Sequence, residues 1–259
     1  MPGNDLELLI DAARAGGQVA RRYFRQAPRV WEKAGGAGPV TQADIEVNDT
    51  LRARLMSARP GYGWLSEESP DDPARLEAAR VFVLDPIDGT RAFISGQEAW
   101  ALSLAVAEEG EIIAAVVHLP MLGRTYAARR GGGATLNGAP IAASARVELE
   151  GGKLLAAAAA LEPTRWRGGP PRMERHFRPS LAYRLCLVAE GRFDAMLTLR
   201  DTWEWDVAAG DLIAREAGAA VMTATGEAPR YNQPRPLLPG FIAAAAALRG
   251  PLLDRLVAV

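Results

Sequence analysis

Two carboxylates three residues apart, Asp85 and Asp88, follow an apolar run in this 259-residue chain. The run, Val-Phe-Val-Leu at 81–84, predicts a buried strand. Carboxylates at the end of a buried strand are costly to desolvate unless a cation meets them. Mg²⁺ takes oxygen ligands, so the pair predicts a site for a hard divalent ion. Gly89-Thr90, which follows, can open a helix or turn whose free N–H groups face an anion, and together these features predict a phosphate site.

Three other segments carry acidic residues that could complete such a site. Glu67-Glu68 follows an apolar patch, and Asp206 stands at the head of a helix rich in small residues. Each has a plain alternative, because a Glu pair is often a solvated surface and Asp is a favoured helix N-cap. Pro39-Val-Thr41-x-x-Asp44 is a weaker fourth segment. The occurrence of these segments in one chain, in this order, favours a shared site.

The ordered segments resemble the motifs of the inositol monophosphatase superfamily. The members of this superfamily are Mg²⁺-dependent, lithium-sensitive phosphatases. The resemblance rests on Glu67-Glu68, Asp85-Pro-Ile-Asp-Gly-Thr90 and Trp205-Asp206-x-Ala-Ala-Gly210, with the weaker segment around Asp44, and runs from near residue 6 to near residue 245. It implies an α/β fold, a layered α/β/α/β/α sandwich of the inositol monophosphatase/fructose-1,6-bisphosphatase type. It also implies a metal-dependent phosphoric monoester hydrolase.

The resemblance implies a ligand set for two Mg²⁺ ions. Glu67, Asp85 and the carbonyl of Ile87 are expected to hold the first ion, and Asp85, Asp88 and Asp206 the second, with Asp85 bridging. A third, weaker ion is expected near Glu67, and Mn²⁺ is an alternative to Mg²⁺. Two metals roughly 4 Å apart can clamp the attacking and leaving oxygens of an in-line displacement.

The same resemblance implies supporting roles for other polar residues. Thr90, paired with Glu67 or Asp44, is expected to orient the attacking water, and the N–H groups of Gly89 and Thr90 to bind phosphate oxygens. Glu68 is expected to point away from Glu67, behind the direct ligands.

Four further side chains are open to more than one interpretation. Lys33 either helps to order a metal or is a solvated lysine. Cys186 lies in an apolar run and favours a small buried hydrophobe. His118 lies in a strand-like run, whereas His176, in a basic stretch, could touch an anion. Two histidines are too few for a zinc hydrolase with several His ligands.

The substrate is expected to contact Ser180 and Arg184 on its alcohol side, in addition to Asp88, Gly89, Thr90 and Asp206. Inositol monophosphatases resemble Gly-Ser-Ala-Ala-Leu-Asn in this region, and Arg184 stands where their Asn would. A basic residue suits a second phosphate. This favours a 3′(2′),5′-bisphosphate nucleotidase, which converts 3′-phosphoadenosine 5′-phosphate to AMP and phosphate. Pro179 in place of an expected Gly, and an apparently shortened loop at 162–177, count against it.

Other substrates and roles stay open at this point. Inositol-1-monophosphatase is the main alternative, followed by histidinol-phosphate and fructose-1,6-bisphosphate phosphatases. Arg184 could instead pair with Glu190 or solvent, and Tyr183 could stack on adenine or lie in the core. An inactive regulatory relative would be expected to lack a ligand or Thr90, and all of these residues are present.

Composition narrows the class of partners. The chain has 49% apolar and 24% charged residues and a net charge of −1, so neither a nucleic acid polymer nor an anionic membrane is an expected partner. The single cysteine fits a reducing compartment. Without a signal-peptide pattern, and with a longest apolar stretch (236–248) too short to cross a bilayer, the sequence predicts a cytoplasmic enzyme. The resemblance to the family also implies that the protein forms a homodimer.

Periodicity and turn residues place the elements that must position these groups. We expect two helices before the apolar strand, then a hairpin-rich region, then alternating strands and helices. The division falls near residue 146, giving a half at 1–145 with most metal ligands and a half at 146–259 with Asp206 and the substrate-side helix. The expected elements are helices at 5–24, from about 44 to 58, 180–190 and 206–217; strands at 99–108, 112–118, 125–128, 154–161 and 241–248; and turns at 34–38, 109–110, 121–123 and 131–138.

Overall fold

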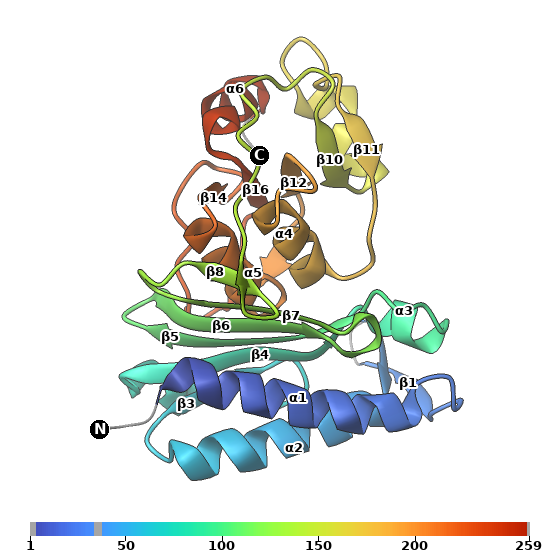
Figure 1. Cartoon of the computed structure of the whole chain (residues 1–259), viewed down its shortest axis with the longest axis vertical. Coiled ribbons are helices and arrows are strands. Elements are labelled where there is room, and N and C mark those ends of the chain that lie inside the picture. The colour runs from blue at the N-terminus through green and yellow to red at the C-terminus, as the bar shows by residue number, and fades with distance from the viewer. Residues whose placement is uncertain (1–3, 34–37, 258–259) are drawn as a thin grey trace.

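The computed structural model describes residues 4–33 and 38–257. Helices and sheets alternate in layers along the long axis of the molecule (Figure 1). The glycine-rich loop predicted at 34–38 lies, apart from Gly38, outside the described residues.

Two long helices form the first layer and confirm the predicted pair. α1 (Asp5–Tyr23) and α2 (Gln42–Ala58) run side by side along one face of the larger sheet (Figure 1). Thr41 caps α2 through a capping box in which its side chain and the carboxylate of Asp44 satisfy each other's backbone N–H groups. Gly16 permits close packing on the sheet, because a Cβ there would lie 2.7 Å from Leu102.

The larger sheet has seven strands in the order β3-β4-β5-β6-β7-β8-β9. β3 and β4 are parallel, and the other neighbours are antiparallel. The predicted hairpin strands are confirmed, but the segment predicted as a turn at 131–138 contains a short strand, β8. The strands are β3 (Gly63–Ser66), β4 (Arg80–Asp88), β5 (Ala101–Glu108), β6 (Glu111–Leu119), β7 (Arg124–Arg129), β8 (Ala134–Leu136) and β9 (Ala139–Pro140).

The smaller sheet has five strands in the order β11-β10-β12-β16-β14. The strands predicted at 154–161 and 241–248 are half right, because each ends midway and continues as a short 3₁₀ helix. Alanine favours helical over extended backbone, so an Ala-rich segment turns once no strand pairs with it. The strands are β10 (Lys153–Ala156), β11 (Glu174–His176), β12 (Ala195–Thr198), β14 (Ala219–Met222) and β16 (Phe241–Ala245).

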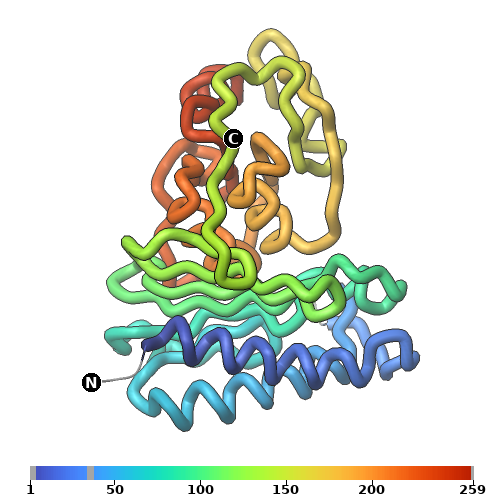
Figure 2. The backbone as a smooth tube through the Cα atoms, in the orientation of Figure 1, coloured from blue at the N-terminus to red at the C-terminus, as the bar shows by residue number. Residues whose placement is uncertain are grey.

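Two helices fill the layer between the sheets. α4 (Leu181–Ala189) and α5 (Glu204–Glu216) lie above the larger sheet, and α6 (Arg249–Arg255) lies at the far end (Figure 1). The largest cluster of buried apolar residues joins both sheets to α4 and α5. Figure 2 shows the chain passing once from the larger sheet to the smaller one, in the segment after β9. The layered α/β/α/β/α sandwich is therefore confirmed, while the division into halves at residue 146 stays a prediction.

Short elements complete the fold around the cavity described below. They are the antiparallel pairs β1 (Val30–Glu32) with β2 (Pro39–Thr41) and β13 (Thr202–Trp203) with β15 (Leu237–Leu238), the helix α3 (Thr90–Ile94), and 3₁₀ turns at Pro73–Glu77, Pro120–Leu122, Ala158–Leu161, Pro163–Arg165 and Ala246–Leu248. Within the described ranges, none of the helices combines the length and apolarity that crossing a membrane requires.

Candidate active site

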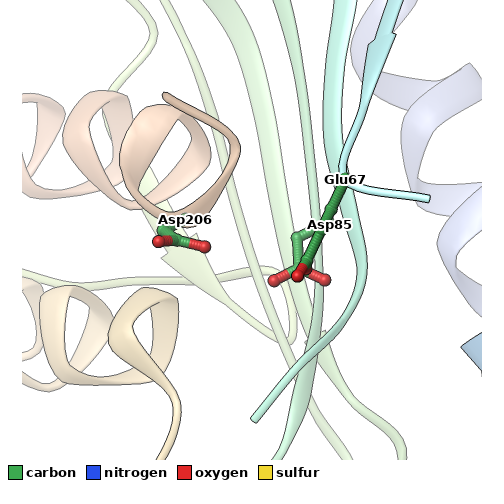
Figure 3. Close-up of side chains that lie close together, drawn as sticks. All are labelled: Glu67, Asp85 and Asp206. Atoms are coloured by element: carbon green, nitrogen blue, oxygen red, sulfur yellow. The ribbon is translucent and has the colours of Figure 1, made fainter. Parts of the chain in front are cut away.

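Two neighbouring strands and one helix bring three carboxylates together. β3 and β4 are parallel and end side by side, with Ser66 opposite Leu84, so Glu67 emerges next to Asp85. The N-terminal turn of α5 brings Asp206 to them from the other side (Figure 3). One carboxylate oxygen from each residue lies within 4.8 Å of the other two. The sequence prediction that these segments share a site is therefore matched by the geometry.

Asp206 does not cap α5, as the alternative interpretation required. The helix begins at Glu204, with Trp203 as its N-cap, so Asp206 is inside the first turn. Small residues let this helix sit deep between the sheets, because a Cβ at Gly210 would lie 2.4 Å from Leu185 of α4. The carboxylate of Asp206 is consequently directed at Asp85 rather than at its own backbone (Figure 3).

The acidic cluster has more negative charge than the protein neutralises. Burial raises the pKa of Asp85 well above its ordinary value, and the nearby Glu67 and Asp88 charges raise it further. Burial and then Asp88 and Glu67 act the same way on the pKa of Asp206. Asp85 accepts a hydrogen bond from the Ile87 N–H at 2.9 Å. In the described chain, the carboxylates of Asp85 and Asp206 form no ion pair. Oxygen donors with such a charge deficit fit a hard divalent cation.

Asp88 links the cluster to the start of α4. A bulge in the β4–β5 pairing separates it from Asp85. One oxygen, Oδ2, accepts hydrogen bonds from Ser180 Oγ at 2.6 Å and from the Ala182 N–H at 2.7 Å. Ser180 itself is fully buried and caps α4 through the Tyr183 N–H. The structure therefore places Ser180 behind Asp88 instead of in the cavity.

Thr90 lies at the N-terminus of α3, after Gly89 in the left-handed conformation with φ of 100°. Its hydroxyl lies 3.1 Å from Asp44 Oδ1 and 3.1 Å from the carbonyl of Ile87, either of which it can donate to. Asp44 is fixed in turn by the hydroxyl of Thr41. Of the two partners that the sequence left open for Thr90, the structure has Asp44, and Glu67 is not hydrogen-bonded to it.

Lys33 contacts both members of the acidic pair. Its Nζ lies 2.6 Å from Glu67 Oε1 and 2.6 Å from Glu68 Oε1, so the solvated-lysine alternative is wrong. Burial lowers the pKa of Lys33, but the two carboxylates outweigh it and the net shift is upward. Glu68 was expected to turn away from Glu67, yet both reach the same ammonium. Burial, with the charge of Glu67, raises the pKa of Glu68 to about 7.

The cluster opens into a cavity of about 870 Å³. Gly89, Thr90 and the carboxylates of the cluster line part of it, and the remainder is lined by apolar and aromatic side chains together with four arginines from several elements. Arg184, the residue predicted from the sequence, lines the cavity, and burial lowers its pKa to about 10. Its Nε donates to the carbonyl of Arg178, and its guanidinium lies 4.3 Å from the centre of the Phe177 ring.

The structure decides between the alternatives that the sequence left open for Arg184 and for Tyr183. Glu190 accepts hydrogen bonds from Arg124 at 3.0 Å and from Tyr126, so it is not the partner of Arg184. Tyr183 is buried, with its ring centre 6.5 Å from that of Tyr126, as expected of a core residue.

Three arginines that the sequence reasoning missed also line the cavity: Arg91, Arg165 and Arg200. Within residues 4–33 and 38–257, their side chains form no hydrogen bond or ion pair. Nothing in their spacing distinguishes them from the rest of the 30 Lys and Arg residues. The one available signal is that Arg91 directly follows the Asp85–Thr90 motif.

Three residues considered in the sequence lie outside the cavity lining. His176 Nε2 lies 2.8 Å from Glu174, and its ring packs edge-on against Phe193. His118 is hydrogen-bonded to Thr125, and Cys186 is fully buried. The expectation that Cys186 is a small buried side chain is confirmed.

Several known proteins are similar to this chain in sequence and in fold. The model of the inositol monophosphatase family matches residues 4–257. An inositol-1-monophosphatase of Rhizobium meliloti is 36% identical over 85% of this chain and 86% of its own, and a 3′-phosphoadenosine 5′-phosphate phosphatase of Mycobacterium leprae is 32% identical over 96% and 92%. An IMPase structure from Thermotoga maritima superposes with a TM-score of 0.83 at 27% identity, covering 96% of this chain and 95% of that one. The chain therefore belongs to the inositol monophosphatase family of metal-dependent phosphatases.

Proposed function

We propose that this phosphatase uses Mg²⁺ and acts on a small phosphate monoester that carries a second phosphate, with 3′-phosphoadenosine 5′-phosphate as the leading candidate. The observation that carries the proposal is the content of one cavity, which combines the acidic cluster with Arg91, Arg165, Arg184 and Arg200. An ester with one phosphate needs few cations beyond the metals, whereas a second phosphate needs partners of its own.

The residues present suit two ions. Glu67, Asp85 and the Ile87 carbonyl would hold one, and Asp85, the free oxygen of Asp88 and Asp206 would hold the other. Bound there, the ions would neutralise the ester and make a nucleophile available near neutral pH. A third ion near Glu67, and Mn²⁺ in place of Mg²⁺, fit the same donors. Lithium is expected to inhibit by taking the second ion's place.

The chain's own groups would position the reactants. The Thr90 hydroxyl, aligned by Asp44, would orient the attacking water, with the Glu67 carboxylate beside it. The N–H groups of Gly89 and Thr90 would bind the phosphate oxygens at the start of α3. Lys33 would hold Glu67 and Glu68 in place and limit their mutual repulsion.

The second phosphate would meet the arginines. Arg184 was expected to make this contact, but its Nε is engaged by the carbonyl of Arg178. Arg200 also acts on this site, because its charge lowers the pKa of Asp206 just as the charge of Arg184 lowers the pKa of Asp88. We therefore assign the second phosphate to Arg184 and Arg200 together, and place Ser180 with Asp88 as a support.

The alternative is hydrolysis of inositol 1-phosphate. It is favoured by the relative that is 36% identical and carries the name inositol-1-monophosphatase. The arginine-rich cavity is the reason for ranking it second, since a single phosphate on an uncharged ring leaves most of those cations without a partner.

A phosphate-release panel tests the proposal. With Mg²⁺ present, kcat/KM is measured for 3′-phosphoadenosine 5′-phosphate, inositol 1-phosphate, histidinol phosphate and fructose 1,6-bisphosphate. The proposal expects the first to be preferred. Arg184→Ala and Arg200→Ala should each raise its KM by roughly 10- to 100-fold and affect inositol 1-phosphate less. Equal losses on both substrates, or a wild type that prefers inositol 1-phosphate, would overturn the proposal.

We further infer a cytoplasmic homodimer. A single cysteine suits a reducing compartment, and the homodimer is what the resemblance to the family implies. Light scattering on the purified protein would test the dimer, and a monomer at micromolar concentration would contradict it.

A further inference from the structure

Two tryptophans form a stacked pair at the cavity. The rings of Trp203 and Trp205 are 4.8 Å apart between centres and tilted by only 8°. Both line the same cavity as Asp206. Trp203 is 42% exposed, which is unusual for so large an apolar side chain. Trp205 stacks on one face of the Trp203 ring, which leaves the opposite face for a ligand.

The backbone holds this pair rigidly. Trp203 lies in β13, paired with Leu237 of β15, and is also the N-cap of α5. The carbonyl of Trp205 accepts a hydrogen bond from Ser103 of the larger sheet at 3.1 Å. A flat aromatic surface that is already fixed loses little conformational entropy when a ligand stacks on it.

The surroundings of the pair suit an anionic ligand with a flat ring. Arg200, three residues before Trp203, lines the cavity and acts on the charge of Asp206. The cavity volume of about 870 Å³ is near the upper end of the range for small-molecule sites and exceeds the needs of a single sugar phosphate. Aromatic side chains bind nucleobases by stacking, and the interaction tolerates any base because each has a π-face.

We propose that Trp203, backed by Trp205, is the platform on which the planar base of the substrate stacks, so that the leaving alcohol is a sugar hydroxyl of a nucleotide. The inference rests on the proposed nucleotide substrate and deepens it. It assigns base recognition to Trp203, and the second phosphate to the arginines, as separable contributions. Trp203 is thus a specificity-determining residue, whereas the acidic cluster acts on every substrate.

Four substrates separate the two contributions. Adenosine 3′-phosphate and 3′-phosphoadenosine 5′-phosphate carry the base with one and two phosphates. Glycerol 2-phosphate and fructose 1,6-bisphosphate carry one and two phosphates without a base. Steady-state kcat and KM are measured for all four with wild type, Trp203→Leu and Trp203→Phe.

Trp31→Leu is the matched control variant. Trp31 is 45% exposed, close to the value for Trp203, but it does not line the cavity. It therefore reports the effect of removing an exposed indole from this protein without removing the platform.

Trp203→Leu should raise KM for the two base-bearing substrates by roughly 5- to 50-fold more than for the two without a base. Trp203→Phe should recover most of that difference, and Trp31→Leu should show no such difference. Equal losses on all four substrates, which a displaced Asp206 or a disturbed dimer would also produce, would overturn the inference.

The panel distinguishes this inference from the proposed function. If the second phosphate brings no gain in kcat/KM over one phosphate, the proposed function fails while the base preference can still stand. Should Trp203→Leu not fold, the wild type provides the test through inhibition by AMP and by ribose 5-phosphate. AMP should inhibit at roughly tenfold lower concentration, and equal inhibition would overturn the inference.

Discussion

Helix α5 carries carboxylates of two kinds: Asp211 and Glu204 are buried with their own donors, and Asp206 is half-buried without one. Asp211 is 1% exposed and accepts hydrogen bonds from Arg215 Nε at 2.7 Å and Tyr231 at 2.9 Å. Glu204 is fully buried and accepts the N–H groups of Asn232 and Gln233 at 2.7 and 2.9 Å. Asp206, between them in sequence, has no hydrogen-bond donor within the part of the chain that the structure describes.

The comparison shows how a ligand site is recognised in a folded chain. Burying a carboxylate is costly, and the protein offsets that cost at Asp211 and Glu204 with its own donors. At Asp206 the protein supplies neighbouring carboxylates instead, which raise its pKa further. A carboxylate that lacks donors from the protein and lies among other carboxylates is expected to bind a cation from outside the chain.

Removing metal should have the largest effect, because the acidic cluster is expected to depend on it entirely. Exhaustive chelation followed by gel filtration should abolish phosphate release, and added Mg²⁺ should restore it. Zn²⁺ is expected to restore it poorly, since the donors are all oxygens. Phosphatase activity that persists without any divalent ion would break the distinction between the two kinds of carboxylate.

Asp206→Asn should lower kcat on the order of 10²-fold or more, since it removes a charge that would hold an ion. The free energy of unfolding of the metal-free variant should match or exceed that of the wild type, because one repelling carboxylate is gone. Steady-state kinetics and urea unfolding measure the two. Glu68→Gln is the control, since Glu68 is already paired with Lys33, and a larger kcat loss there than at Asp206 would reverse the assignment.

Asp211→Asn should show the opposite pattern. Replacing a carboxylate that is paired with Arg215 should lower the free energy of unfolding by about 1–3 kcal/mol, while kcat stays close to that of the wild type. Urea unfolding and steady-state kinetics on the same preparation check both parts. A variant as stable as the wild type would mean that the donors around Asp211 contribute less than their geometry indicates.

His118 gives the smallest expected effect and extends the comparison to a half-buried base. Burial, aided by the charges of Arg21 and Arg14 and opposed by a backbone hydrogen bond at Arg124, lowers its pKa to about 4. Because an unfolded chain binds this proton near an ordinary pKa of about 6.5, stability should fall as pH falls from about 6.5 to 4. His118→Asn should remove about 1–2 kcal/mol of the stability lost between pH 7 and 5. Chemical unfolding at both pH values measures this, and an unchanged slope would contradict it.

Local patterns were sufficient for most of the fold and for the candidate metal ligands. The helix at Asp5–Tyr23 has a continuous apolar face, and the strand at Arg80–Asp88 has an apolar run before two carboxylates. Both are properties of neighbouring residues. The prediction for the two Ala-rich segments was half wrong, because the length of each strand depends on which strands pair with it in the smaller sheet.

The sequence by itself determined which residues are the candidates for the chemistry: Glu67, Asp85, Asp88 and Asp206, with Thr90 and Asp44. Residue type and short spacing are enough to identify candidates within each segment, such as Asp85 and Asp88 three residues apart. Only the tertiary structure decided that Thr90 pairs with Asp44, that Lys33 joins both glutamates, and that Arg91, Arg165 and Arg200 enter one cavity. Those contacts join elements far apart in the chain, so their geometry exists only once the two sheets and the helices between them have packed.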